Sequence, residues 1–135
     1  MYSIKSIMTT NVIFVRPETS IFEAMTLLTE NKISGVPVVD DQLRVIGILS
    51  EKDVLEMLMD KDLDIKKTVG DYMTREVVCF TEEDSAIDIC KFFIRTNIRR
   101  VPIVKDGKLI GVVSRRDIVE LILEIRTKMS DFRFH

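Results

Sequence analysis

Apolar and polar positions follow the same order twice along the chain. Each copy begins with a short β-rich run, at residues 12–15 and 77–80, which predicts a strand. A serine with an acid three residues later then precedes apolar residues at helical spacing, which predicts a helix with one buried face. Two further apolar runs joined by a polar turn predict a hairpin, and a closing Ser-x-x-Asp predicts a second helix. Each copy therefore predicts a β-α-β-β-α unit.

The two copies also match residue by residue. Met8-Thr9 recurs 65 positions later as Met73-Thr74, and Asp53 recurs 64 positions later as Asp117 because the second hairpin turn is one residue shorter. A unit of about 60 residues buries little surface alone, so we expect the copies to pack sheet to sheet as one α+β body with pseudo-two-fold symmetry. The expected segments are a first repeat at 1–59, a charged linker at 60–71, a second repeat at 72–123, and a helix end and tail at 124–135.

Composition narrows the classes of function. The chain has 135 residues, 46% hydrophobic and 31% charged, with a formal net charge of −2, so no global basic field would attract nucleic acid or anionic lipid. No apolar run approaches the ~20 residues that span a bilayer, and Cys79 and Cys90 lack metal or redox spacing. We expect a cytoplasmic protein with free, inert thiols. The only histidine is His135 and no phosphate loop or metal-ligand cluster is present, so we expect no enzyme.

The repeated phrases resemble the tandem cystathionine-β-synthase domain pair, also called a CBS pair or Bateman module. They are the two Met-Thr pairs, the Val-Pro phrases at 33–39 and 98–104, and the endings at 47–53 and 111–117. The likeness covers about residues 1–123. It implies a non-enzymatic sensor that requires no cofactor, binds AMP, ADP, ATP or S-adenosylmethionine between its repeats, and signals to an effector protein. It also implies a homodimer.

The resemblance further implies site residues in both copies. Asp53 and Asp117 would accept hydrogen bonds from ribose hydroxyls, and Ser50 and Ser114 would lie near the first phosphate. The residues that would border the adenine are Thr9, Asn11, Val12, Ile33, Ser34, Gly35, Val36, Pro37, Thr74, Val77, Ile98, Val101 and Pro102.

The chemistry of Ser-x-x-Asp is consistent with this assignment. A carboxylate can accept from two vicinal hydroxyls, and the free N–H groups of a helix start favour an anion. The alternative is purely structural, with the serines as ordinary N-caps and the aspartates complementing the helix dipole.

The two copies differ in basic residues where a phosphate would bind. Ser34-Gly35 in the first copy is replaced by Arg99-Arg100 in the second, and arginine binds phosphate in a bidentate manner. We therefore expect non-equivalent clefts and a phosphorylated ligand. The candidate phosphate ligands are Lys52, Arg99, Arg100, Arg115 and Arg116. Alternatively, Arg99, Arg115 and Arg116 are solvated surface charges.

The sequence is also compatible with two other functions. The chain could be a ligand-blind dimerisation or docking module whose clefts are filled by side chains. Single-stranded nucleic-acid binding through the arginine pairs is the less favoured alternative, because the chain is acidic overall and has few aromatic residues.

Overall fold

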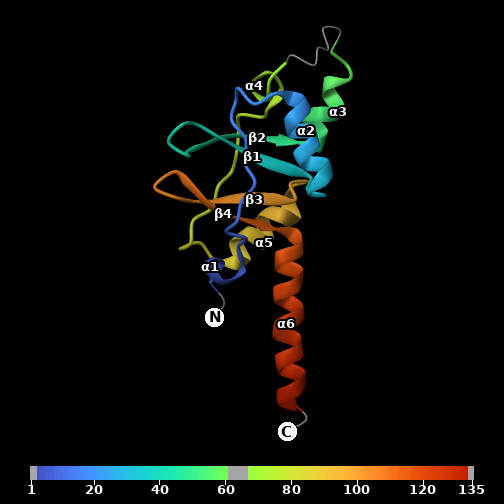
Figure 1. Cartoon of the computed structure of the whole chain (residues 1–135). Helices are drawn as coiled ribbons and strands as arrows, with labels where there is room; N and C mark the ends of the chain where they lie inside the picture. The colour runs from blue at the N-terminus through green and yellow to red at the C-terminus, as the bar shows by residue number, and fades with distance from the viewer. Residues whose placement is uncertain (1–2, 61–66, 134–135) are drawn as a thin grey trace.

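The computed structural model describes residues 3–60 and 67–133, without the side chains of residues 130–133. Two small antiparallel sheets lie one above the other, with helices beside them (Figure 1). This arrangement confirms the predicted α+β class. The elements are α1 (Ile4–Ile7), α2 (Ile21–Glu30), β1 (Gly35–Val39), β2 (Val45–Ser50), α3 (Glu51–Met57), α4 (Val69–Tyr72), α5 (Ala86–Arg95), β3 (Arg100–Lys105), β4 (Lys108–Ser114) and α6 (Arg115–Arg133).

Local signals in the sequence position the helices and turns. The Ser20 hydroxyl accepts the Glu23 N–H at 3.0 Å, and the Ser85 hydroxyl accepts the Asp88 N–H at 3.1 Å, so both predicted N-caps are confirmed. The β3–β4 turn has positive φ at Asp106-Gly107, as Asp-Gly hairpins prefer. The linker predicted at 60–71 lies partly outside the described residues, and its last part forms α4.

The strands predicted at 12–15 and 77–80 are wrong. Each segment makes a single parallel bridge, Val15 to Val38 and Phe80 to Ile103. The cause is the proline in each neighbouring strand: continuing the ladder toward Ile13 would require an N–H from Pro37, which has none. Pro102 ends the second ladder in the same way.

The segment that leads into each half, residues 4–9 in the first half and 69–74 in the second, is called its lead-in segment, and it pairs with the sheet of the other half. Thr9 exchanges two backbone hydrogen bonds with Val112 of β4, at 2.9 and 3.0 Å, and Thr74 does the same with Ile48 of β2, at 2.9 and 2.8 Å. The approach is close. A Cβ atom on Gly47 would lie 2.9 Å from the Thr74 carbonyl oxygen, so β2 needs glycine at this position.

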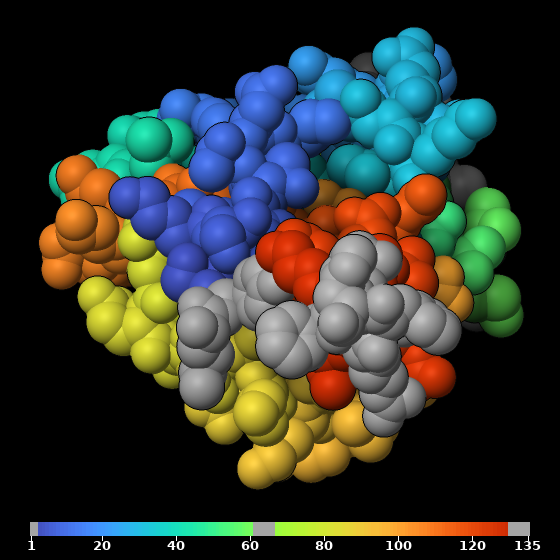
Figure 2. Space-filling view, turned by 90° about the horizontal axis from the view of Figure 1, so that it is seen from below, coloured from blue at the N-terminus to red at the C-terminus, as the bar shows by residue number. Residues whose placement is uncertain are grey.

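Each hydrophobic core therefore contains residues from both halves of the chain. The first core, under β1 and β2, includes Val69 and Met73 from the second lead-in segment. The second core, under β3 and β4, includes the fully buried Ile4 from the N-terminus. In Figure 2 the dark blue N-terminal residues adjoin yellow residues of the second half and the red α6. Neither half completes its core without the other.

α6 extends well beyond the two sheets (Figure 1). It has 19 residues, whereas the equivalent α3 has seven. Ile118 and Leu121 are buried in its first turns, and residues 122–129 are all exposed. Neither α6 nor any other helix in the described ranges combines the length and apolar character needed to cross a membrane.

Candidate functional site

A cleft of about 530 Å³ lies between the facing surfaces of the two sheets. Val36 and Val38 of β1 belong to the first core, so the alternation of the strand places Gly35 and Pro37 on the opposite face, toward the second sheet. Pro102 on β3 lies on its facing surface by the same alternation, and it also lines the cleft. The volume is within the range of about 300–1,000 Å³ that is typical of small-molecule sites.

Asp53 lies at the floor of this cleft and is 7% exposed. Its Oδ2 accepts the Ser50 N–H at 2.8 Å and the Ser50 hydroxyl at 3.1 Å, while the Asp53 N–H donates to Ser50 Oγ at 3.3 Å. The structural role considered for Ser-x-x-Asp is therefore present as a complete capping box. A carboxylate has about four lone-pair sites, so Asp53 retains capacity to accept from a ligand.

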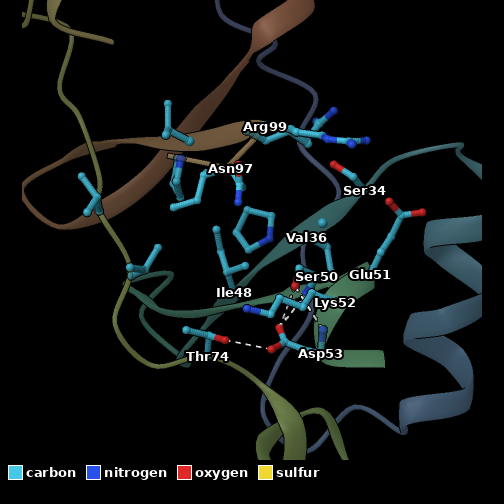
Figure 3. Close-up of a pocket in the computed structure, with 18 of the residues that line it drawn as sticks. Ser34, Val36, Ile48, Ser50, Glu51, Lys52, Asp53, Thr74, Asn97 and Arg99 are labelled. Carbon is cyan, nitrogen blue, oxygen red and sulfur yellow. Dashed lines mark hydrogen bonds between the residues drawn. The ribbon is translucent and has the colours of Figure 1, made fainter. Parts of the chain in front are cut away.

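Thr74 is hydrogen-bonded to Oδ1, the other oxygen of the Asp53 carboxylate. Its hydroxyl donates to Asp53 Oδ1 at 2.8 Å (Figure 3), and its backbone is held by the two bonds to Ile48. The hydroxyl oxygen can still accept a hydrogen bond. Asp53 and Thr74, from the two halves of the chain, thus present adjacent acceptors to the cleft.

Charged side chains of both signs line the cleft. Figure 3 shows Arg99 close to Ser34 at one end, and Asp53 with Thr74 at the other. Lys52 is exposed, and its Nζ lies 4.0 Å from Oε1 of Glu56. The basic lining residues are Lys52, Arg99 and Arg100, and the acidic ones are Glu51, Asp53, Glu56 and Glu76. The cleft is therefore not strongly basic, and its cationic character is concentrated at the Arg99-Arg100 end.

Arg100 is the most buried of these basic groups. Its Nε is buried and has no hydrogen-bond partner in the described part of the chain. Burial lowers the pKa of the Arg100 guanidinium, and the charge of Asp117 partly offsets this effect. Asp117 itself caps α6: its carboxylate accepts the Ser114 N–H at 2.8 Å, and its N–H donates to Ser114 Oγ at 3.2 Å.

Arg115 and Arg116 both have partners within the protein. Arg115 donates to three carbonyl oxygens at the C-terminal end of α5, those of Phe93, Thr96 and Ile98, at 2.6 to 3.0 Å. It therefore satisfies acceptors that a helix end leaves open. Arg116 is exposed and pairs with Glu120 at 3.3 Å. Neither arginine lines the cleft.

The cleft brings together most of the residues predicted to contact a ligand. Those that line it are Ser34, Gly35, Val36, Pro37, Ser50, Lys52, Asp53, Thr74, Val77, Ile98, Arg99, Arg100, Val101 and Pro102. Those that do not line it are Thr9, Asn11, Val12, Ile33, Ser114, Arg115, Arg116 and Asp117. Ile33 instead packs against the first core. The ligand roles of both groups stay predictions.

Sequence reasoning missed several lining residues. Ile48 and Val112 lie opposite Pro37 and Pro102 in the two hairpins, so the strand pairing carries a signal that could have identified them. Asn97 is at the start of the segment that leads into β3, and Glu76 follows the second lead-in segment. No sequence pattern marks these two.

Groups suited to covalent or metal chemistry are scarce. Cys79 and Cys90 are free and half-buried, and burial raises the pKa of the Cys79 thiol, which keeps it protonated near neutral pH. Within residues 3–60 and 67–133, no three His, Cys, Asp or Glu side chains are grouped so that they could hold a metal ion. The absence of enzymatic activity stays a prediction.

Comparison with known sequences assigns the family. Residues 4–60 and 69–124 each match the CBS domain family. This chain belongs to the CBS domain family, as a tandem pair. It is 34% identical over 120 residues to an uncharacterized protein of Methanocaldococcus jannaschii, covering 88% of this chain and 42% of that protein. It is 32% identical to the CBS domain-containing protein CBSX1 of Arabidopsis thaliana, over 83% of this chain and 59% of the relative. The CBS pair thus spans only about half the length of these relatives.

Solved structures of CBS pairs share the fold. Arabidopsis CBSX2, solved in complex with AMP, has 34% sequence identity and a TM-score of 0.84, over 93% of this CBS pair and 99% of that chain. The CBS domain pair of a second protein, solved with 5′-methylthioadenosine and S-adenosyl-L-methionine, has 28% identity and a TM-score of 0.79, over 90% and 96%. These structural neighbours are CBS pairs in complex with adenosine derivatives.

Proposed function

We propose that this CBS pair is a regulatory module that binds an adenosine-containing ligand in the cleft between its two sheets. The observation that carries the proposal is the Asp53–Thr74 pair of acceptors, which faces apolar side chains and two arginines across one cavity. The AMP complex of CBSX2 supports the ligand class. No additional cofactor is required for binding of this kind, and the signal passes to an effector protein of unidentified nature.

The chemistry of the cleft suggests how such a ligand lies. Pro37 and Ile48 on one sheet, with Pro102 on the other, offer apolar surfaces to an adenine ring. The ribose hydroxyls donate to Asp53 and Thr74, which hold acceptors side by side. The phosphate extends toward the basic end of the cleft, where an arginine can form paired hydrogen bonds with it.

The charge of the cleft favours a ligand with few phosphates. Four carboxylates and three basic groups line it, so each phosphate beyond the first adds negative charge without adding a cation. We therefore expect AMP to bind more tightly than ADP or ATP. S-adenosylmethionine is the phosphate-free comparison, because it has a positive sulfonium group where AMP has its phosphate.

Replacement of Asp53 by asparagine tests the binding site. Asparagine retains the size of the side chain but loses the charge and one acceptor, so we expect AMP affinity to fall tenfold or more, which is about 1.4 kcal/mol. The measurement is titration calorimetry with AMP, ADP, ATP, S-adenosylmethionine and NAD. Asp88→Asn, the same change at an exposed site in the first turn of α5, should leave affinity within twofold. If none of the five ligands binds the wild-type chain, the proposal is wrong.

A second copy of the chain fits the exposed helix surfaces. Leu55 on α3 and Leu58 and Met59 directly after it are more than half exposed, and so are the residues 64 positions later, Val119, Ile122 and Leu123 on α6. Both helices lie on the side of the molecule away from the hairpin turns (Figure 1). The pseudo-two-fold axis thus repeats the same apolar ridge, which suits a symmetric interface between two copies. We include a homodimer in the proposed function.

Introduction of a negative charge on these ridges tests the homodimer. We expect the wild-type chain to sediment at twice the 15.6 kDa mass of one chain, and Leu58→Glu combined with Ile122→Glu to sediment as a monomer, because each substitution would place a carboxylate in an apolar interface. Analytical ultracentrifugation gives both masses. Leu43→Glu, on the hairpin turn at the opposite side, is the control and should remain dimeric. A monomeric wild-type chain would refute this part of the proposal.

A further inference from the structure

One of the positions at which the two halves differ lies beside the helix start of each half. In the first sheet Gly35 pairs with Ser50, the N-cap of α3, and in the second sheet Arg100 pairs with Ser114, next to the start of α6. Position 35 and position 100 are therefore equivalent, each beside the serine–aspartate helix start of its own half. The first half has glycine at this position and therefore no side chain, whereas the second half has the long side chain of arginine.

The Arg100 side chain lies on the facing surface of its sheet. Val101 and Ile103 are in the second core, so the alternation of β3 directs Arg100 to the opposite face, with Pro102. Its Nε is removed from solvent and has no partner within the described residues. Ser114, the strand partner of Arg100, donates its N–H to the Asp117 carboxylate at 2.8 Å, so Arg100 and the carboxylate that corresponds to Asp53 are neighbours of the same residue.

We infer that Arg100 fills the cleft of the second half, so that each chain binds one ligand, at Asp53, and the Asp117 cleft is closed by its own arginine. The inference rests on the proposed function and narrows it to one of the two pseudo-equivalent sites. In this inference Arg100 takes the space that a ribose would need beside Asp117, and the guanidinium and that carboxylate interact through their opposite charges. The open first cleft contains Gly35, Ser50 and Asp53 on its lining, whereas Ser114 and Asp117 are not on it.

Gly35 offers the reciprocal test, because the backbone there has room for a side chain. A Cβ atom on Gly35 would lie 3.4 Å from the Leu49 carbonyl oxygen and 3.7 Å from Ser50 Cα, which are ordinary van der Waals contacts. An arginine introduced at position 35 would therefore keep the strand pairing and project into the cleft. It would place in the first half the side chain that the second half already has.

Titration calorimetry with AMP on the exchanged variants tests the inference. The wild-type chain should bind one AMP per chain, and Gly35→Arg should weaken binding at least tenfold. Arg100→Gly should raise the stoichiometry toward two, with the added site lost again when Asp117→Asn is combined with it. In the double variant, Gly35→Arg with Arg100→Gly, we expect a single site that depends on Asp117. Stoichiometry is the readout because Arg100 also lines the first cleft.

Two results would overturn the inference. One is a wild-type stoichiometry of two, and the other is a folded Arg100→Gly variant that still binds one AMP. A ligand-free readout separates this inference from the proposed function: the crystal structure of Arg100→Gly should show a new cavity lined by Ser114 and Asp117. If AMP binds neither protein, the proposed function fails, and the presence or absence of that cavity still decides whether Arg100 closes the second cleft.

Discussion

Ile4→Ala is expected to lower the free energy of unfolding by about 2–5 kcal/mol, the range for removing a buried isoleucine from a packed core. Ile4 lies in a helix of only four residues near the N-terminus, yet it is fully buried in the second core beside Ile89 and Ile118. Alanine would leave a cavity among residues far away in the sequence. Urea denaturation of the variant and the wild type measures the difference.

The location of the damage distinguishes this result from simple fraying of the N-terminus. Hydrogen exchange should accelerate in α5 and in the β3–β4 hairpin, because these elements enclose Ile4, and should change less in α2. Lys5→Ala is the control, since Lys5 is exposed on the same helix, and it should leave stability within about 0.5 kcal/mol. Loss of protection confined to the first sheet would contradict the exchanged arrangement of the lead-in segments.

Gly47→Ala is expected to cost about 1–3 kcal/mol, the usual penalty of overpacking. The new methyl group would lie 2.9 Å from the Thr74 carbonyl oxygen and 3.1 Å from Met73 Sδ. A flexible methionine can move away, but the Thr74 backbone is fixed by its two hydrogen bonds to Ile48. Part of the cost should therefore appear as displacement of the second lead-in segment, which also carries the Thr74 hydroxyl away from Asp53.

The matched control for this substitution is Gly35→Ala, also a strand glycine. A Cβ atom at this position would have no neighbour closer than 3.4 Å. The midpoint temperature of thermal unfolding should therefore be unchanged or slightly higher, because alanine restricts the unfolded chain. Equal destabilisation by both substitutions would show that loss of glycine from a strand, and not the contact with Thr74, is responsible.

Much of the fold could be predicted because the same pattern of elements occurs twice in the sequence. The serine caps at 20 and 85 and the Asp106-Gly107 turn are local signals, and the structure confirms each of them. Whether the segments 12–15 and 77–80 form strands could not be predicted from their own residues. Their extension is stopped by Pro37 and Pro102 in the neighbouring strands, so the deciding group is a missing N–H in another segment.

The site was harder to predict than the fold. A repeat shows that Thr9 and Thr74 are equivalent, but not which sheet each one pairs with, and the exchange places Thr74 on Asp53 of the other half. Arg115 stays a predicted phosphate ligand, but nothing in the sequence indicated that it also donates to carbonyl oxygens at the end of α5. An arginine's target depends on acceptors that folding brings near it, and no spacing in the chain encodes them.

The exchange of the lead-in segments also determines which parts of the molecule would move when the two halves tilt relative to each other. α1 and α6 pack together on the second core, so both ends of the described chain emerge from the same half (Figure 1). Tilting of the first half against the second would leave the separation of the two ends unchanged. A protein joined to either end would be rigidly tethered to one half, and only a contact that bridges both halves could sense their relative motion.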